Sequence, residues 1–256
     1  GSEMCIRDRG RCRMRDWICG FFMAWGMFLA IPCPRKIWSE SARQKMLVCM
    51  PLVGLLAGGV WAGAWLLLRG APGPVRAAVC AAAPWLVTGF MHLDGYMDVC
   101  DAVLSRRDLA TRQRILKDSH CGAFAVICMV LLAMGQWSLF LAAEDVSWLA
   151  LLLIPAATRA CAGLAVLGLR PMGTSQYAAM GPARGGYGAA LWVLLALSVG
   201  LPLWLDGSFG PLAAAVGYGL AVWYGFRNLD GMSGDISGFA LTIGELCGCG
   251  AAILWR

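Results

Sequence analysis

Charged residues are scarce in this 256-residue chain, where Asp, Glu, Lys and Arg together make up 14% of the sequence. An ordinary soluble domain carries about 25%, so the composition excludes a separate soluble domain. Apolar residues reach 59% and glycine contributes 33 residues, a combination that favours close helix packing in lipid. We therefore predict an all-α fold, a polytopic integral membrane helical bundle.

Long basic stripes and CxxC pairs are also missing. The net charge of +6 comes from Lys and Arg in short segments between apolar runs, which is the membrane pattern and gives no indication of nucleic-acid binding. Among the twelve cysteines, Cys247 and Cys249 stand two apart, which is too little for a zinc site. Most of the others lie inside apolar runs, so we interpret them as small buried packing residues.

The apolar runs follow one another closely enough to form a single transmembrane domain. Residues 1–15 are polar and Arg-rich without apolar periodicity, so we treat them as a leader outside the fold and 16–256 as a single transmembrane catalytic domain. The run 17–31 is short for a span of about 20 residues and suits an interfacial or re-entrant helix. Seven membrane segments are expected, or eight if 17–31 crosses: 46–68, 75–91, 121–143, 148–169, 187–205, 209–226 and 236–255.

Loop charges predict the orientation. Acidic turns without Lys or Arg at 144–145 and 206–208 alternate with basic loops at 94–118, 170–184 and around Arg227. The positive-inside rule places the basic loops in the cytoplasm. Three polar, glycine-bearing segments then share that face, which we predict to carry the active site: 92–125, 173–188 and 229–235.

The segment 92–125 holds five of the 15 acidic residues of the chain and five basic ones. Charge between membrane spans is costly and marks a functional site by default. Asp94, Asp98 and Asp101 are spaced i, i+4, i+7, so on a helix they share one face. Three such carboxylates repel one another unless a cation neutralises them, and Mg²⁺ or Mn²⁺ held with substrate phosphate would do so. We predict these three residues as catalytic metal ligands.

The alternative is that these aspartates cap helices and pair with Arg106, Arg107 and Arg112 in a solvated interfacial loop. Three carboxylates on one face, without lysines interleaved at i+4, argue against it. Metal-held carboxylates beside lysines and arginines fit phosphoryl transfer.

Other residues complete the predicted site. Lys117 is expected to bind phosphate as a point charge, beside Asp118 as a further ligand or general base and Ser119 as a substrate contact. Gly95 would let a substrate approach the backbone. Asp235 is expected at the metal or nucleotide, with a helix N-cap as its alternative.

Two further residues leave alternatives open. Arg159 lies inside an apolar run, where a lone arginine is costly unless it meets an anion or a carboxylate. It therefore either contacts a diphosphate or pairs with a neighbouring aspartate. His92 has no second histidine in range, which favours a hydrogen-bonding interface residue over a metal ligand.

The motifs HLDGYMDVCDA (92–102) and KDSHCGAFAV (117–126) resemble the signature of the adenosylcobinamide-GDP ribazoletransferase, or cobalamin 5′-phosphate synthase, family. FLAIPCP (28–34), IPAATRA (154–160) and GDISGFALTIGEL (234–246) resemble its opening, its middle helix and its C-terminal segment. The resemblance implies an Mg²⁺-dependent enzyme of the bacterial inner membrane. It would join α-ribazole or its 5′-phosphate to adenosylcobinamide-GDP and release GMP.

Three positions depart from that family pattern: His120 stands where arginine is common, Ala125 where glycine is common, and Asp230 lies in a Leu-Asp-Gly that replaces a Gly-Gly approach. The change at His120 removes a fixed positive charge beside the expected metal site.

Two other functions remain as alternatives. A CDP-alcohol phosphotransferase also uses an aspartate-rich helix, but its pattern needs an Ala-Arg pair after the Asp-Gly, and Tyr96 and Met97 follow here. An ion-coupled secondary transporter would place its acidic groups near the bilayer midplane, often in paired repeats, and the sequence holds no second copy of the cluster.

Overall fold

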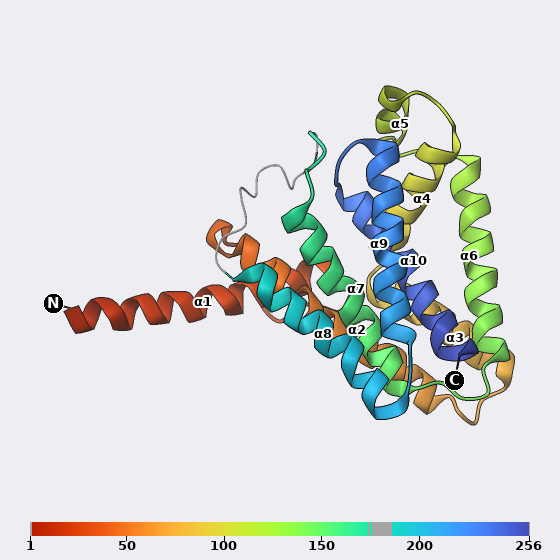
Figure 1. Cartoon of the computed structure of the whole chain (residues 1–256), viewed down its shortest axis with the longest axis horizontal. Coiled ribbons are helices and arrows are strands. Elements are labelled where there is room, and N and C mark those ends of the chain that lie inside the picture. The colour runs from red at the N-terminus through yellow and green to blue at the C-terminus, as the bar shows by residue number, and fades with distance from the viewer. Residues whose placement is uncertain (1, 174, 176–185, 256) are drawn as a thin grey trace.

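The computed structural model of the protein describes residues 2–173, 175 and 186–255, with side chains from Met14 onward. These residues are almost entirely helical (Figure 1) and include no β-strand, which confirms the all-α prediction. The glycine-rich segment 173–188 lies mostly outside the described residues. The helices are α1 (Ser2–Phe28), a short 3-10 helix (Glu40–Ala42), α2 (Arg43–Leu67), α3 (Gly73–Val87), α4 (Met91–Leu104), α5 (Leu109–Ile115), α6 (Ala123–Ala142), α7 (Trp148–Gly168), α8 (Tyr187–Asp206), α9 (Gly210–Leu229) and α10 (Gly234–Leu254).

The described residues contain five helices long and apolar enough to cross a membrane, at Glu40–Leu67, α6, α7, α8 and α10. The pair α3 and α4 would make a sixth as one broken span. The protein is therefore a multi-pass membrane protein, but seven to eight spans is more than the structure supports. The expected span 75–91 ends early, because Gly89 and Phe90 adopt left-handed backbone conformations and α4 leaves α3 at 91°. The 20-residue α9 is less apolar because glycine and tyrosine interrupt it.

The 27-residue α1 is one continuous helix through the boundary drawn between leader and domain, and it projects from the bundle (Figure 1). It is not among the membrane-crossing helices.

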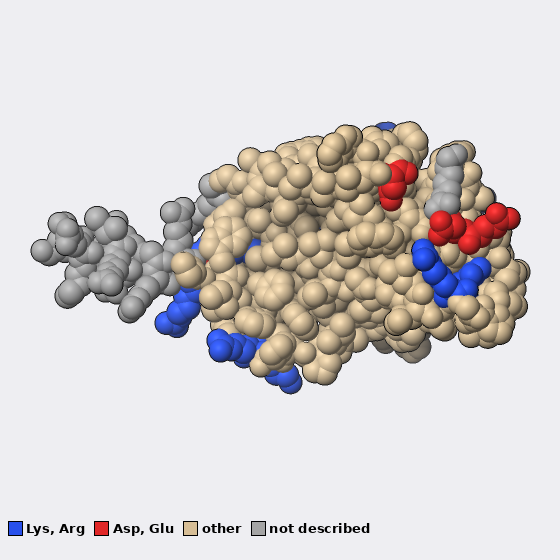
Figure 2. Space-filling view, turned by 90° about the horizontal axis from the view of Figure 1, so that it is seen from below, with Lys and Arg blue, Asp and Glu red and all other residues tan. Residues whose placement is uncertain are grey.

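The bundle has a core and a periphery. In α2, α7 and α10 between 67% and 72% of the membrane window is buried within the protein, whereas in α6 and α8 the share is 22%. The outer faces of α6 and α8 present exposed leucine, valine and tryptophan side chains. Figure 2 shows a wide uncharged surface over the middle of the molecule. Such a surface suits lipid, where no water is present to solvate charge.

Glycines allow the core helices to approach closely. A Cβ on Gly58 of α2 would lie 2.0 Å from the carbonyl oxygen of Leu152 in α7, and one on Gly54 would lie 2.5 Å from that of Pro155. Without these side chains the two backbones are in direct contact, the small-residue packing typical of membrane helices. At these two positions glycine thus serves helix packing.

Two hydrogen-bonded connections join the ends of helices at the start of α10 and the end of α9. The backbone of Met172 donates to Met232 at 2.9 Å, and Met232 donates to Arg170 at 2.9 Å, which fixes the start of α10 against the end of α7. On the other side, Arg112 donates to the Asn228 side chain at 3.0 Å. This contact anchors α5 on the end of α9.

Candidate active site

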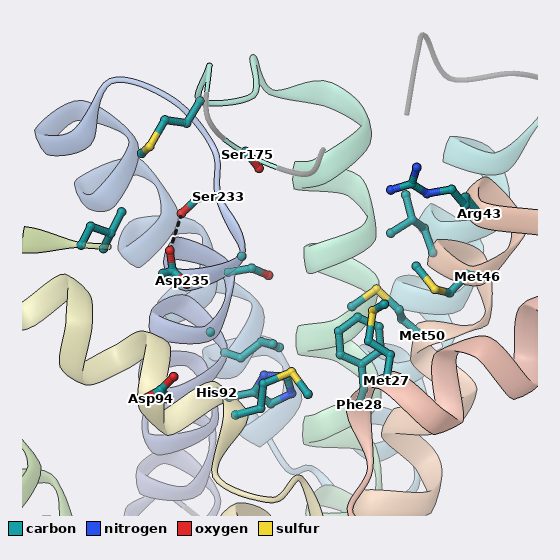
Figure 3. Close-up of a pocket in the computed structure, with 18 of the residues that line it drawn as sticks. Met27, Phe28, Arg43, Met46, Met50, His92, Asp94, Ser175, Ser233 and Asp235 are labelled. Carbon is teal, nitrogen blue, oxygen red and sulfur yellow. Dashed lines mark hydrogen bonds between the residues drawn. The ribbon is translucent and has the colours of Figure 1, made fainter. Parts of the chain in front are cut away.

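A cavity of about 450 Å³ lies where α1, α2, α4 and the start of α10 meet (Figure 3). Its volume falls within the range of roughly 300–1,000 Å³ that is usual for small-molecule sites. One wall is polar and comes from α4, α10 and the segment after α5, whereas the opposite wall comes from α1 and α2 and is mainly apolar. The lining residues are Met27, Phe28, Trp38, Arg43, Met46, Leu47, Met50, Met91, His92, Asp94, Leu116, Lys117, Met172, Ser175, Ser233, Gly234, Asp235, Ser237, Gly238 and Leu241.

Asp94 and Asp235 bring two carboxylates from distant parts of the sequence to the polar wall (Figure 3). They meet because α4 and α10 cross at glycine: a Cβ on Gly95 would lie 2.8 Å from the carbonyl oxygen of Asp235 and 3.0 Å from its Cα. The space beside Gly95 is therefore filled by the α10 backbone. We expected a substrate there, and the structure instead gives Gly95 a packing role that sets the spacing of the two acidic residues.

Ser233 is the N-cap of α10 and accepts a hydrogen bond from the Ile236 backbone at 3.3 Å. Its hydroxyl also lies 3.5 Å from Asp235. Capping was the alternative role for Asp235, but Ser233 fills it. The Asp235 carboxylate thus remains at the cavity wall beside the N-terminus of α10.

Asp98 and Asp101 continue along α4 beyond the cavity lining. The carboxylate of Asp98 is partly buried, and Asp94, Asp235 and Asp101 add negative charge around it. The carboxylate of Asp101 lies against the start of α6, where a Cβ on Gly122 would come within 2.1 Å of it. Among the described residues, none donates a hydrogen bond or forms an ion pair with the side chains of Asp94, Asp98 or Asp101.

The carboxylates near the cavity could supply some, but not all, of the ligands of a divalent cation. Within residues 2–173, 175 and 186–255, no group of three His, Cys, Asp or Glu side chains is arranged to hold a metal ion. The three aspartates are therefore spread along α4 and do not form one ready cage. Magnesium, however, is commonly held by one or two carboxylates together with substrate phosphates. Asp94, Asp98 and Asp235, which are close enough to repel one another, provide such carboxylates.

The segment after α5 separates into two parts. Lys117 lines the cavity, and its contact with phosphate stays a prediction. Asp118 and Ser119 are exposed and lie outside the lining, and the Asp118 carboxylate is 2.6 Å from Nδ1 of His120. The hydrogen bonds from the His120 ring and backbone hold the pKa of the Asp118 carboxyl below its ordinary value. Asp118 is thus engaged outside the cavity.

Arg159 is buried, with 1% of its side chain exposed, and Nη1 lies 2.7 Å from the Glu245 carboxylate on α10. Of the two alternatives for this residue, the structure shows pairing with an acidic neighbour, which is a glutamate and not an aspartate; Arg159 does not line the cavity. Sequence reasoning did not identify Glu245 as that partner, because nothing in the spacing of α7 and α10 indicates their register.

Several lining residues were not anticipated. Arg43 and Trp38 lie near the cavity opening, where the guanidinium is 6.0 Å from the tryptophan ring. The methionines of α1 and α2 form much of the apolar wall, although periodicity alone indicates only that such residues are buried. His92, interpreted as an interface residue, also lines the cavity. These residues surround one space because α1 and α2 lie across the cavity from α4 and α10.

Residues 20–253 match the family model described as Cobalamin-5-phosphate synthase. The chain belongs to this family. A relative from Clostridium botulinum (strain Alaska E43 / Type E3), named Adenosylcobinamide-GDP ribazoletransferase, is 32% identical over 94% of this chain and 100% of its own. The relative of the same name from Ralstonia nicotianae is 34% identical over 94% of this chain and 97% of its own. No solved structure gives a significant match.

Membership in the cobalamin-5-phosphate synthase family confirms the resemblance drawn from the motifs, and with it a transferase of cobalamin biosynthesis. It decides against the CDP-alcohol phosphotransferase and the transporter. A third relative of the same name, from Halalkalibacterium halodurans, is 39% identical over 57% of this chain and 58% of its own.

Proposed function

We propose that this cobalamin-5-phosphate synthase family member joins α-ribazole, or its 5′-phosphate, to adenosylcobinamide-GDP, giving adenosylcobalamin or its 5′-phosphate and GMP. The single observation that carries the proposal is the polar wall of the cavity, where Asp94 and Asp235 from two helices stand with Lys117. Transfer from a diphosphate needs positive charge from a cationic side chain and from a metal ion that carboxylates hold. This wall offers the lysine and the carboxylates together.

In the proposed reaction, a hydroxyl of the ribazole attacks the phosphorus atom on the cobinamide side of the diphosphate. A new oxygen–phosphorus bond forms, the bond to the GMP phosphate breaks, and GMP leaves with the bridging oxygen. The hydroxyl proton passes to a carboxylate at the cavity wall, for which Asp94 and Asp235 are placed. Lys117 offsets negative charge on the diphosphate.

We further propose that Asp98 and one of the two wall carboxylates, Asp94 or Asp235, hold Mg²⁺, with Mn²⁺ as the alternative ion. The other wall carboxylate then takes the proton. When bound, the ion would neutralise charge on the diphosphate and act as a Lewis acid at the phosphoryl oxygens. The support is the mutual repulsion at Asp98, which an added cation would relieve. Asp101 lies farther along α4 and holds its place against Gly122.

The proposed location is the cytoplasmic face of the bacterial inner membrane. The basic residues of the segment between α4 and α6 support this orientation through the positive-inside rule. The cavity lies at the same end of the bundle, since Leu116 and Lys117 of that segment line it.

The test measures GMP release by the detergent-purified protein given adenosylcobinamide-GDP and α-ribazole, with and without Mg²⁺. We expect release that requires both substrates and the ion, and that is abolished by chelation and restored by added Mg²⁺. Release of GMP without the acceptor would indicate simple hydrolysis. The absence of release under all these conditions would contradict the proposed function.

A further inference from the structure

The two walls of the cavity differ in chemistry. Asp94, Asp235 and Lys117 make one side polar. The facing side carries Met27 and Phe28 from α1 together with Met46 and Met50 from α2 (Figure 3). A ligand that fills the cavity must therefore be amphipathic, with a polar end near the carboxylates and an apolar end against the methionines.

The cavity is small relative to the larger of the two proposed substrates. Its volume of about 450 Å³ falls in the lower part of the roughly 300–1,000 Å³ range that encloses drug-sized ligands. A corrin ring with its amide side chains and adenosyl ligand is much larger than that and cannot be enclosed. A single nucleoside is of suitable size, which leaves the guanosine of the donor or the ribazole of the acceptor.

The apolar wall distinguishes between these nucleosides. Guanine presents a polar edge whose donors and acceptors need partners when buried. Met27, Met46, Met50 and Phe28 offer none. The base of α-ribazole is dimethylbenzimidazole, whose edge carries methyl groups. Flexible, polarisable methionine side chains pack well against such an aromatic ring. This part of the wall therefore matches a planar base with an apolar edge, and Arg43 of α2 is the polar side chain beside it.

His92 supplies a second, independent observation. Its side chain is buried, with 8% of the residue exposed, and it lines the cavity between Asp94 and the apolar wall (Figure 3). Its Nε2 atom has no hydrogen-bond partner among the described residues. The Phe28 ring lies 6.2 Å from the imidazole. A buried polar atom without a partner is costly, and a sugar hydroxyl bound at this position would provide one.

Resting on the proposed function, we infer that this cavity binds the acceptor nucleoside, with its aromatic base against Met27, Met46 and Met50. The sugar then reaches His92, and the attacking hydroxyl faces Asp94 and Asp235. The corrin of the donor remains outside the cavity, and only its diphosphate enters the polar side.

The test measures KM for each substrate separately in Met50→Gln, which places an amide of similar length at the apolar wall. We expect KM for α-ribazole to rise about tenfold, because the base would then desolvate an unpaired amide, while KM for adenosylcobinamide-GDP stays within about twofold. Met23→Gln is the matched control. Met23 is buried to a similar degree, 3% exposed against 4% for Met50, but lies outside this cavity. It should leave both KM values unchanged.

A rise in KM for adenosylcobinamide-GDP in place of α-ribazole would overturn the inference, since the wall would then contact the donor. Unchanged KM values for both substrates would overturn it as well. If Met50→Gln fails to fold, Met27→Gln tests the same wall at a residue that is only partly buried. Absence of GMP release by the unaltered enzyme would overturn the proposed function and this inference together, whereas the KM results above overturn the inference alone.

His92→Ala and His92→Gln test the sugar contact. We expect His92→Ala to raise KM for α-ribazole and to leave the inhibition constant of benzimidazole, supplied as a competing base without sugar, unchanged. His92→Gln retains a hydrogen-bonding group and should recover part of the loss. Equal weakening of the nucleoside and the free base would overturn the assignment of His92 to the sugar.

Discussion

Two groups of charged residues lie on α10 and its neighbouring helices. They differ in whether a side chain of opposite charge neutralises them. Arg159 and Glu245 are buried between α7 and α10 and neutralise each other at 2.7 Å. Asp94, Asp98 and Asp235, where α4 crosses α10, repel one another and have no cationic partner among the described residues. The first pair balances its charge within the protein, and we interpret it as a structural element. The second set has no balancing charge among the described residues, and we propose that a ligand supplies it.

The largest expected effect is on stability, from breaking the complete pair. Arg159→Met leaves Glu245 buried without its partner and should lower the free energy of unfolding by about 3–5 kcal/mol. Thermal unfolding in detergent measures this loss. The double variant with Glu245→Leu should recover most of it, because no isolated charge then remains. Unaltered stability in the single variant would show that the pair is not structural.

The second effect is on activity, from removing one of the unbalanced carboxylates. Asp98→Asn should lower the rate of GMP release by about 10²–10³-fold and leave the protein folded and inserted in the membrane. Asp108→Asn is the matched control, because Asp108 caps α5 through Thr111 at 3.0 Å and asparagine caps equally well. Normal turnover by Asp98→Asn would remove Asp98 from the site.

The third effect tests the close crossing that brings α4 and α10 together. Gly95→Ala would place a methyl group 2.8 Å from the Asp235 carbonyl oxygen, so we expect a loss of about 1–3 kcal/mol in stability and a parallel loss of activity. Gly135→Ala in α6, where nothing lies within 4 Å, should be neutral or slightly stabilising. Equal behaviour of the two variants would contradict a packing role for Gly95.

The smallest effect is expected at Asp118, outside the cavity. Asp118→Asn should change the rate of GMP release by less than about threefold, since an exposed pair with His120 contributes little. His120→Ala should raise the pKa of Asp118, which NMR titration would show. Because the pKa of Asp118 is lowered in the folded protein, its pairing with His120 stabilises the fold at pH values above the ordinary carboxyl pKa. This stabilisation is lost as the pH falls through the lowered pKa. A loss as large as that of Asp98→Asn would restore Asp118 to the reaction.

Local composition was sufficient to predict the membrane class and most helices. Apolar runs of about 20 residues leave few alternatives to a transmembrane helix, and α6, α7, α8 and α10 formed where expected. The aspartates of 92–102 stand out because charge is rare in this chain. The predicted number of spans was wrong at Gly89 and Phe90. These two residues have left-handed backbone conformations, which break one expected span into the bent helix pair α3 and α4.

The composition of the chain by itself determined that this is a helical membrane protein, and its motifs determined the family, because lipid solvation and motif spacing are both local properties. Only the tertiary structure decided which charges meet. Arg159 could face a ligand or a carboxylate until the register of α7 against α10 placed Glu245 beside it. Likewise Asp235 joins Asp94, and the methionines of α1 and α2 face them, only because glycines let the helix backbones come into contact.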